Sequence, residues 1–483
     1  MDGSATFVEL DRSVGPGCSE VSILDPNESS FYDFVSDEEV TERKQEEPCE
    51  DSEDSSDNPE DVDAVSEDER VVRSLRERDK LVFILSEAGK PIYCRHGSEE
   101  KLVSLFGLMQ ALVFCVQDDD DQIKSITAGA YRIAFLNKGP LIFVAVSRRG
   151  ETPGQLALHL GYAQSLIVSV LTAAQLKKIF EQRRNYDLRK LLGGADRLMD
   201  NLLDGLEQDP AYLLGAVSCL ALNPSVRDSI SDAIVRHCAK LKNLVFAILL
   251  ADSQLVTLVR MKKYMLHPAD LHLLINLVAS SESFKLSESW TPICLPRFDA
   301  NGFLHAHVSY LADDCQACLL LLTVDKDQFF VLSEAKQGIV QRLRRYKCLE
   351  AINRAMKNGG YTMQDVNIPE IRHFLYKARP TAQYTAPLFS APYDDSYEKD
   401  RLLALYHRMH QRMLLPGSQR HLKLVYVVGK YECLLCWVTA FFELYAAIEP
   451  LVEKEAVIPR VEKLLNWIKS EESRLFILTS TTF

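Results

Sequence analysis

A strand, a turn, a second strand and a helix follow one another within residues 81–116, and this order constrains the fold more than any other feature of the chain. Residues 81–85 are uniformly apolar and rich in β-formers, and residues 91–94 are the returning strand of a hairpin. Apolar side chains then recur at helical spacing up to Val116. The start of this helix carries an N-cap and two acids that complement the helix dipole: Ser98, Glu99 and Glu100. The sequence therefore predicts that a β-β-α unit opens the folded part, with Leu105, Met109 and Leu112 in its core.

Three further apolar runs and a second helix extend this unit. Residues 123–128, 131–136 and 141–147 are short and separated by glycine turns, as in a meander. Thr152 and Pro153 then provide an N-cap and a first helical position. The order β-β-α-β-β-β-α predicts one antiparallel five-stranded sheet with helices packed on it, closed by a helical stretch over residues 185–204.

The same order of elements recurs twice without sequence identity. We expect a first domain at 80–205, a helical linker at 206–240, a second domain at 241–358 and a third at 368–483. The second domain is expected to end in one helix over residues 328–357, and the third in a strand at 475–478. A chain of 483 residues with 47% hydrophobic residues is long enough for about two to four domains.

The first 75 residues differ sharply in composition from the rest. Residues 1–70 hold 24 acidic and 4 basic residues, a balance of −20, whereas the remainder of the chain carries +7. We expect a disordered acidic tail that is solvated or folds back on basic surface. Its two small apolar islands, at 21–26 and 31–35, are either residual composition or short docking motifs.

The chain begins without the pattern of a secretory signal, so its twelve cysteines are expected to be reduced thiols in a cytosolic protein. Residues 152–176 contain no charged side chain if His159 is neutral. They do contain several glutamines and serines, which favours a buried helix over a membrane span.

Motifs of covalent catalysis and nucleotide hydrolysis are absent from the sequence, including the P-loop, the nucleophile elbow and the zinc-protease helix. Two Cys-x-x-Cys pairs, Cys315 with Cys318 and Cys433 with Cys436, lie at or in apolar strands without a second ligand pair, which favours core thiols over zinc. His407 and His410 lie three residues apart on one helix, and we expect them to be solvated.

Five sequence strings in the same order resemble one known family, the Mon proteins, also called the SAND vacuolar-fusion family. They begin with VFILSEAGKPIY at 82–93, which is followed by Arg95 and by Gly-Ser-Glu at 97–99. The other four are NYDLR at 185–189, WTPICLP at 290–296, RHFLYK at 372–377 and RLFIL at 474–478. The resemblance covers the chain from about residue 80 onward. It implies an α+β fold of three tandem longin-like domains after the acidic tail.

The resemblance also implies a function. Mon proteins are subunits of the Mon-Ccz complex, a guanine-nucleotide exchange factor that activates the late-endosomal and vacuolar Rab GTPase. This activity drives early-to-late endosome conversion and fusion with the vacuole or lysosome. An exchange factor needs no nucleophile, because it stabilises a GTPase conformation that no longer holds its nucleotide. We therefore expect no covalent catalysis, no cofactor and no metal.

Partners and location follow from the same resemblance. The first longin domain is expected to pair with that of a Ccz-type subunit in an obligate heterodimer, which forms the platform for the GTPase. An early-endosomal Rab and an anionic, phosphoinositide-bearing membrane are expected to recruit the complex, and an animal version would bind a third, propeller-containing subunit. We expect a cytoplasmic protein, peripheral on endosome, lysosome or vacuole membranes, that binds no nucleic acid.

The competing interpretation is a longin scaffold or tethering adaptor that binds GTPases without exchanging their nucleotide. Longin architecture by itself is compatible with both. Candidate contacts with the GTPase or partner are charged residues of the opening hairpin and helix start, for which an ordinary solvated turn is the alternative. They are Glu87, Lys90, Arg95, Glu99 and Glu100.

Basic clusters are candidates for anionic lipid, with solvated helix faces as the alternative. Their members are Lys177, Lys178, Arg183, Arg184, Lys262, Lys263, Arg342, Arg344, Arg345 and Lys347.

Prolines bracket the predicted strand at 290–296, which predicts an edge strand with unpaired backbone. We interpret it as a docking site for the recruiting Rab, formed by Trp290, Pro292, Ile293 and Leu295. The tail residues Ile23, Leu24 and Pro26 are expected to cover this site in cis and so to be autoinhibitory. The alternative is a core tryptophan beside ordinary turn prolines.

Overall fold

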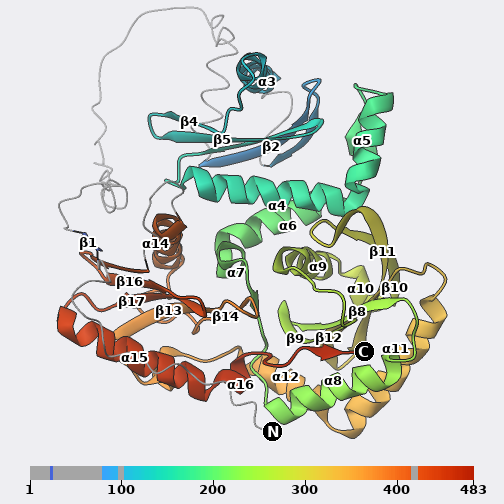
Figure 1. Cartoon of the computed structure of the whole chain (residues 1–483), viewed down its shortest axis with the longest axis vertical. Coiled ribbons are helices and arrows are strands. Elements are labelled where there is room, and N and C mark those ends of the chain that lie inside the picture. Colours follow the sequence, from blue (N-terminus) through green and yellow to red (C-terminus); the bar gives the residue numbers. More distant parts are fainter. Residues whose placement is uncertain (1–21, 25–78, 96–102, 415–422) are drawn as a thin grey trace, which may run out of the picture. The chain divides into compact units, whose positions relative to one another are not determined.

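A computed structural model describes residues 22–24, 79–95, 103–414 and 423–483 of the chain (Figure 1). The described residues form two compact units. One contains the first two predicted domains, and the other contains most of the third.

The first domain is a five-stranded antiparallel sheet with the strand order β3-β2-β6-β5-β4. Alternate residues of the central strand β2 belong to two different cores, so both faces of the sheet are covered. Helix α3 covers one face and α4 the other (Figure 1). The elements are β2 (Lys80–Ser86), β3 (Pro91–Arg95), α3 (Val103–Asp118), β4 (Ser125–Ala128), β5 (Tyr131–Lys138), β6 (Leu141–Ser147) and α4 (Pro153–Leu171). This order confirms the predicted fold class for the first domain.

Helix α3 packs on the sheet through the residues that its periodicity predicted. Leu105 and Met109 are buried against Phe83 and its neighbours, and Leu112 is partly buried against the same core. The predicted helix start at Ser98, with Glu99 and Glu100, lies outside the described residues.

Helix α4 begins as predicted, because the Thr152 hydroxyl accepts a hydrogen bond from the Gln155 backbone N–H and Pro153 follows the cap. It is the one described helix long and apolar enough to cross a membrane, yet more than half of its apolar window is buried in the first-domain core. The helix ends at Leu171 because Thr172 has a positive φ of 59°. The Thr172 hydroxyl accepts a hydrogen bond from the Gln175 backbone N–H and so caps α5 (Ala173–Gln182).

The segment after α5 differs from prediction. The expected helix at 185–204 begins only at α6 (Ala195–Gln208), because Gly194 precedes it at φ 87°. One 3-10 turn, Leu188–Lys190, lies before it. The linker then contains α7 (Pro210–Leu214), β7 (Val217–Ser218) and α8 (Pro224–Cys238).

The second domain is a six-stranded sheet with the order β10-β11-β12-β8-β9-β18. Its five antiparallel strands match the prediction, and β18 (Thr481–Thr482) adds in parallel to β9. The other elements are β8 (Leu244–Ala251), β9 (Gln254–Arg260), α9 (Pro268–Ser280), α10 (Ser283–Leu286), β10 (Ser289–Leu295), β11 (Asp299–Ala312), β12 (Cys315–Thr323), α11 (Phe329–Arg345) and α12 (Cys348–Asn358).

Two predicted elements of this unit were wrong. The helix expected over 328–357 is divided between α11 and α12, because Lys347 adopts a left-handed φ of 55°. The strand expected at 475–478 is absent. The helical turn α16 (Glu472–Leu475) occupies its start, and the chain pairs with β9 only from Thr481.

The third domain has the strand order β1-β15-β16-β17-β13, with α14 on one side of the sheet and α15 on the other (Figure 1). Strand β1 pairs in parallel with β15, and the remaining neighbours are antiparallel. The elements are β1 (Ser22–Leu24), α13 (Met363–Val366), β13 (Ile371–Ala378), α14 (Ser396–Leu414), β15 (Leu424–Val428), β16 (Cys433–Val438), β17 (Phe442–Ile448) and α15 (Lys454–Ser470). Strand β14 (Gln383–Thr385), which follows β13 in the chain, belongs to the other unit and pairs there with β7.

Candidate interaction surfaces

The turn of the opening hairpin is exposed and held in place. Gln110 of α3 donates a hydrogen bond from Nε2 to the Glu87 carbonyl oxygen at 2.6 Å. Gly89 has φ +76°, and a Cβ there would lie 2.3 Å from Gln110 Oε1, so the turn requires glycine. The Lys90 ammonium donates to the Asn185 carbonyl at 2.8 Å. Glu87 and Lys90 therefore lie on a fixed, solvent-facing turn that is tied to α3.

Arg95 is predicted to contact the GTPase or the partner, but its side chain does not lie on this exposed turn. Its side chain is 7% exposed and forms ion pairs with Asp204 and, at 3.1 Å, with Glu207, both on α6. The sequence did not reveal these partners because they lie more than 100 residues away. Arg95 holds α6 against the edge of the first sheet.

Lys80 is the centre of the same buried network. Its Nζ lies 2.6 Å from Glu151 Oε1 and 2.9 Å from Glu207 Oε1, and it donates to Nδ1 of His159 at 2.9 Å. Burial alone raises the pKa of each glutamate, but Lys80, together with Ser147 and Arg149 at Glu151 and with Arg95 and Arg149 at Glu207, outweighs burial and holds both pKa values below the ordinary value. The network therefore joins the first sheet to α4 and α6 in its ionised form.

The outer face of α3 is an exposed apolar surface. Leu108 is 55% exposed and Phe114 is 37% exposed. Gly107, Ala111 and Cys115 extend this face, which carries no charge before Asp118 at the end of the helix. A helix that is apolar on most sides is normally buried, whereas this face of α3 is left exposed by the residues that the structure describes.

Trp290 lies on β10, which is an edge strand as predicted. Its ring stacks on His305 with centroids 5.6 Å apart and meets Phe329 edge-on at 6.0 Å. Phe330, which contacts Phe329, is 81% exposed. Trp290 is partly buried against the second-domain core, so it forms the inner part of an aromatic surface whose outer part is Phe330.

The other residues predicted beside Trp290 divide between two environments. Pro292 is exposed, but Ile293 and Leu295 are 5% and 1% exposed and belong to the core that α9 covers. Because side chains alternate along a strand, Ile293 and Leu295 face inward and cannot form an exposed docking surface.

The tail segment also differs from prediction. Ile23 and Leu24 lie in β1, which pairs with β15 of the third domain rather than with β10 beside Trp290. Pro26 lies outside the described residues.

The basic clusters fall in three settings. Lys177, Lys178, Arg183 and Arg184 are all exposed at α5, where Lys177 forms an ion pair with Glu181 at 3.8 Å. Lys262 and Lys263 are exposed in the loop after β9. Arg345 and Lys347 are exposed near the end of α11, whereas Arg342 is half-buried with its guanidinium 5.1 Å from the Tyr346 ring. The α5 cluster is the most open of the three.

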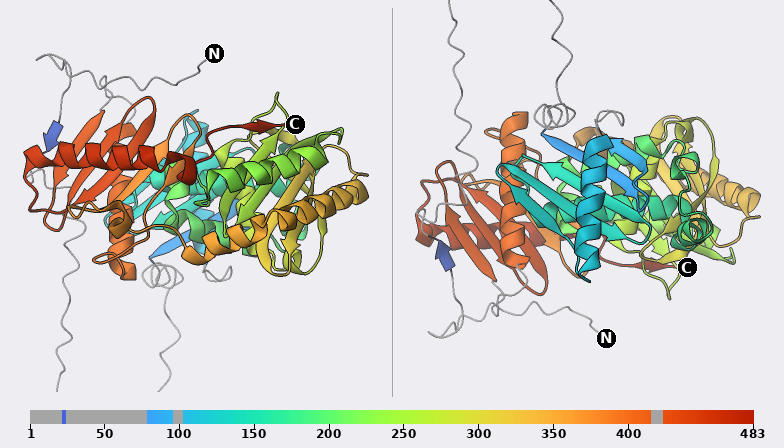
Figure 2. Two further views of the ribbon diagram at one scale, coloured as in Figure 1. Left: turned by 90° about the horizontal axis from the view of Figure 1, so that it is seen from below. Right: turned by 90° about the horizontal axis from the view of Figure 1, so that it is seen from above.

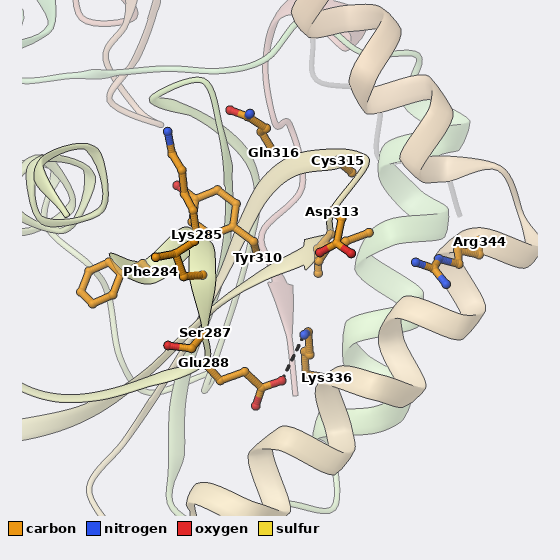
Figure 3. Close-up of a pocket in the computed structure, with 13 residues that line it drawn as sticks. Phe284, Lys285, Ser287, Glu288, Tyr310, Asp313, Cys315, Gln316, Lys336 and Arg344 are labelled. Carbon is orange, nitrogen blue, oxygen red and sulfur yellow. Dashed lines mark hydrogen bonds and ion pairs between the residues drawn. The ribbon is translucent and has the colours of Figure 1, made fainter. Parts of the chain in front are cut away.

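Arg344 faces a polar cleft of about 390 Å³ in the second domain (Figure 3). Lys336 lies on the same helix, α11, and pairs with Glu288 at 3.1 Å across the cleft. Asp313, from the turn between β11 and β12, projects between Lys336 and Arg344. The cleft therefore carries both positive and negative side chains. Arg344 lines it, whereas the neighbouring Arg345 does not, so the two arginines belong to different surfaces.

The cysteine pairs are arranged as core thiols. Cys315 belongs to the core under α8 and α11, whereas Cys318 belongs to the core under α9, so the two thiols face opposite sides of the sheet. Cys433 and Cys436, three residues apart on β16, are buried and alternate in the same way. No group of three metal-ligating side chains occurs among the described residues.

The expectation that His407 and His410 are solvated was wrong. His407 is 6% exposed, and His410 Nδ1 lies 2.7 Å from the Tyr445 hydroxyl on β17. Both lie on the face of α14 that packs on the third sheet. Burial lowers the pKa of His410 to about 3.

Matches to known proteins cover most of the chain. Residues 80–202, 242–341 and 370–472 match, in order, the first, second and third Longin domains of FUZ, MON1 and HPS1. The cattle protein named vacuolar fusion protein MON1 homolog A is 45% identical over 425 residues, which cover 88% of this chain and 76% of the relative. The chain belongs to the MON1 family.

Other MON1 relatives show the breadth of this likeness. The Takifugu rubripes relative named Protein SAND is 46% identical over 417 residues, covering 86% of this chain and 79% of the relative. The vacuolar fusion protein MON1 of Cryptococcus neoformans is 37% identical over 408 residues, covering 84% and 65%. The MON1 family is one of membrane-traffic proteins with three longin domains, which confirms the family and fold that the five sequence strings indicated.

Proposed function

We propose that this chain is one subunit of a heteromeric guanine-nucleotide exchange factor that acts on a late-endosomal or vacuolar Rab GTPase in vacuolar fusion. The outer face of α3 carries the proposal, because it is an apolar surface that the described residues leave open. A Ccz-type longin subunit is the proposed partner on this face.

The geometry of the first domain supports a shared platform for the GTPase. The exposed turn with Glu87 and Lys90 is tied to α3 by Gln110, so a partner bound to α3 would lie beside this turn. The GTPase would then contact both subunits. Such a platform acts by binding the nucleotide-free form of the GTPase more tightly than the loaded form, and incoming GTP releases it by the same coupling.

Recruitment is proposed to use two other surfaces. The aromatic surface of Trp290, His305, Phe329 and Phe330 would bind the early-endosomal Rab, since exposed aromatic clusters dominate binding at protein interfaces. The exposed α5 cluster would meet an anionic, phosphoinositide-bearing membrane. The protein is then proposed to be cytoplasmic and to bind peripherally to endosome, lysosome or vacuole membranes. A propeller-containing third subunit is proposed to complete the complex.

The direct test is release of labelled GDP from a panel of Rab GTPases. We expect the chain alone to leave release close to the intrinsic rate, and the chain with its Ccz-type partner to accelerate release from one Rab well above that rate. Intrinsic release from every Rab with the heterodimer would favour a scaffold or tethering adaptor. Full activity from the chain alone would refute the shared platform.

The partner surface can be tested separately from folding. Leu108→Glu places a charge on the exposed apolar face, so we expect loss of co-purification with the partner and an unchanged melting temperature. Gln117→Glu, near the end of the same helix, is the control and should keep the partner. Leu105→Ala removes a core side chain and should cost about 2 to 5 kcal/mol of folding stability. A Leu108→Glu variant that still binds the partner would exclude this face.

The recruiting surface can be tested on liposomes that carry the early-endosomal Rab. Trp290→Ala should reduce recruited exchange by about tenfold or more and leave exchange in solution unchanged. Because Trp290 is partly buried, its removal also affects the core, so Phe330→Ala is used as a second variant. The Phe330 side chain is so exposed that its removal should not affect folding. Normal recruitment of a folded Phe330→Ala variant would argue against this surface, as would equal loss of exchange in solution.

A further inference from the structure

Strand β15 would be an unprotected sheet edge if β1 were removed. It consists of Leu-Val-Tyr-Val-Val, with neither proline nor charge, and pairs with β16 along its whole length without a register shift. Strands of this composition at an open edge are templates for pairing with another strand. This edge therefore requires a cover.

The other edges of the first two domains carry protection of their own. In the first sheet, β3 begins with Pro91 and β4 is only four residues long. In the second sheet, β10 contains Pro292 and an irregular register between Ile293 and Leu295. Proline, short length and irregular pairing each discourage the addition of a strand. The remaining edge, β9, is seven residues long and contains no proline, and it is covered by the parallel strand β18.

Strand β1 covers β15 in the same manner. Ser22, Ile23 and Leu24 pair in parallel with Val425, Tyr426 and Val427. In both views of Figure 2, β1 is the short blue arrow beside the orange and red sheet. Parallel neighbours require a long connection, and β1 lies about 400 residues from β15 in the chain. The added strand β1 thus lies on β15, the edge strand that has no protection of its own.

We propose that the β15 edge is a strand-acceptor site and that Ser22–Leu24 of the same chain is its occupant. Backbone hydrogen bonds of a parallel ladder provide the binding, so the site would take any extended segment that competes with Ser22–Leu24. Because the ladder is only three residues long, the occupant is held mainly by its covalent attachment to the same chain.

Amide hydrogen exchange of residues 424–428 in the full chain tests the occupant. Ile23→Pro places a residue with a fixed φ and no N–H in the middle of the three-residue ladder and should speed exchange of this segment about tenfold. Val35→Pro, in the second apolar island of the tail, is the matched control and should leave exchange unchanged. Equal exchange in wild type and Ile23→Pro overturns the proposal. Protection that disappears on dilution would assign the strand to a second copy and overturn an occupant from the same chain.

Binding of a labelled synthetic peptide of residues 18–28 tests the acceptor site itself. The peptide should bind the Ile23→Pro chain about tenfold more tightly than wild type, because the internal competitor is lost. Equal affinity for the two proteins overturns the proposal. Ile23 pairs with the third domain, so the outcome is independent of the proposed exchange activity.

Discussion

Replacing Lys80 with methionine is expected to destabilise the first domain by about 3 to 5 kcal/mol, because it removes one partner of a buried ion network. Methionine preserves the length of the side chain but not its charge. Glu151, whose side chain is 9% exposed, would lose its ion pair with Lys80, and Glu207 would keep only its two arginine partners. The α6 helix, which Glu207 anchors, is then expected to loosen from the first sheet.

Hydrogen exchange measured on peptides from β2 and β6 reports this change locally, since the three tryptophans of the chain lie outside the first domain. We expect exchange to be faster by about two to four orders of magnitude. Arg148→Met is the matched control, because its ion pair with Asp79 lies nearby but is largely exposed and should contribute less than about 1 kcal/mol. Similar exchange in the two variants would show that the Lys80 network does not stabilise the domain.

The elements predicted correctly from sequence are those whose signals are local. Strands β2 and β6 are continuous apolar runs between turn residues, and α4 begins at an unambiguous Thr152 and Pro153 cap. The interrupted helices were missed because they depend on single left-handed residues. Lys347 divides α11 from α12 although neither its type nor its neighbours predict a positive φ.

The interaction surfaces were harder to predict, because exposure is a tertiary property. Arg95 resembles a surface charge in sequence, and only the folded position of α6 brings Asp204 and Glu207 to it. His410 resembles a solvated residue until β17 places Tyr445 against it. For α3 the signal was present, since the described helix carries no charge before Asp118, but an apolar helix by itself does not show which face remains open.

Lowering the pH from 7 to 5 is expected to destabilise the third domain through its buried histidines. His373 is 1% exposed, its ring stacks on Phe389 at 4.5 Å, and its Nδ1 lies 3.1 Å from the Tyr406 hydroxyl. Burial lowers the pKa of His373 to about 3, as it does for His410. The neutral ring is therefore the form that the fold accommodates.

The sign follows from proton binding. A histidine binds protons below its ordinary pKa of about 6.5 in the unfolded chain, but only below about 3 in the folded domain. The contribution of neutral His373 to the free energy of unfolding is thus fully present above pH 6.5 and is lost as the pH falls toward 3. At pH 5 the loss is about 2 kcal/mol relative to pH 7. The buried glutamates Glu151 and Glu207 have lowered pKa values, so their contribution is lost only below their ordinary pKa of 4.5.

Unfolding by urea at pH 7 and at pH 5 measures this effect, with Trp437 and Trp467 as reporters of the third domain in a Trp290→Phe background. His373→Phe retains a flat ring for stacking on Phe389 but has no titrating group. It is expected to be less stable than wild type at pH 7, where it lacks the Tyr406 contact, and to lose about 2 kcal/mol less than wild type between pH 7 and pH 5. His410→Phe should reduce the pH dependence in the same direction. If His373→Phe loses as much stability on acidification as wild type does, protonation of His373 is not what limits the domain at low pH.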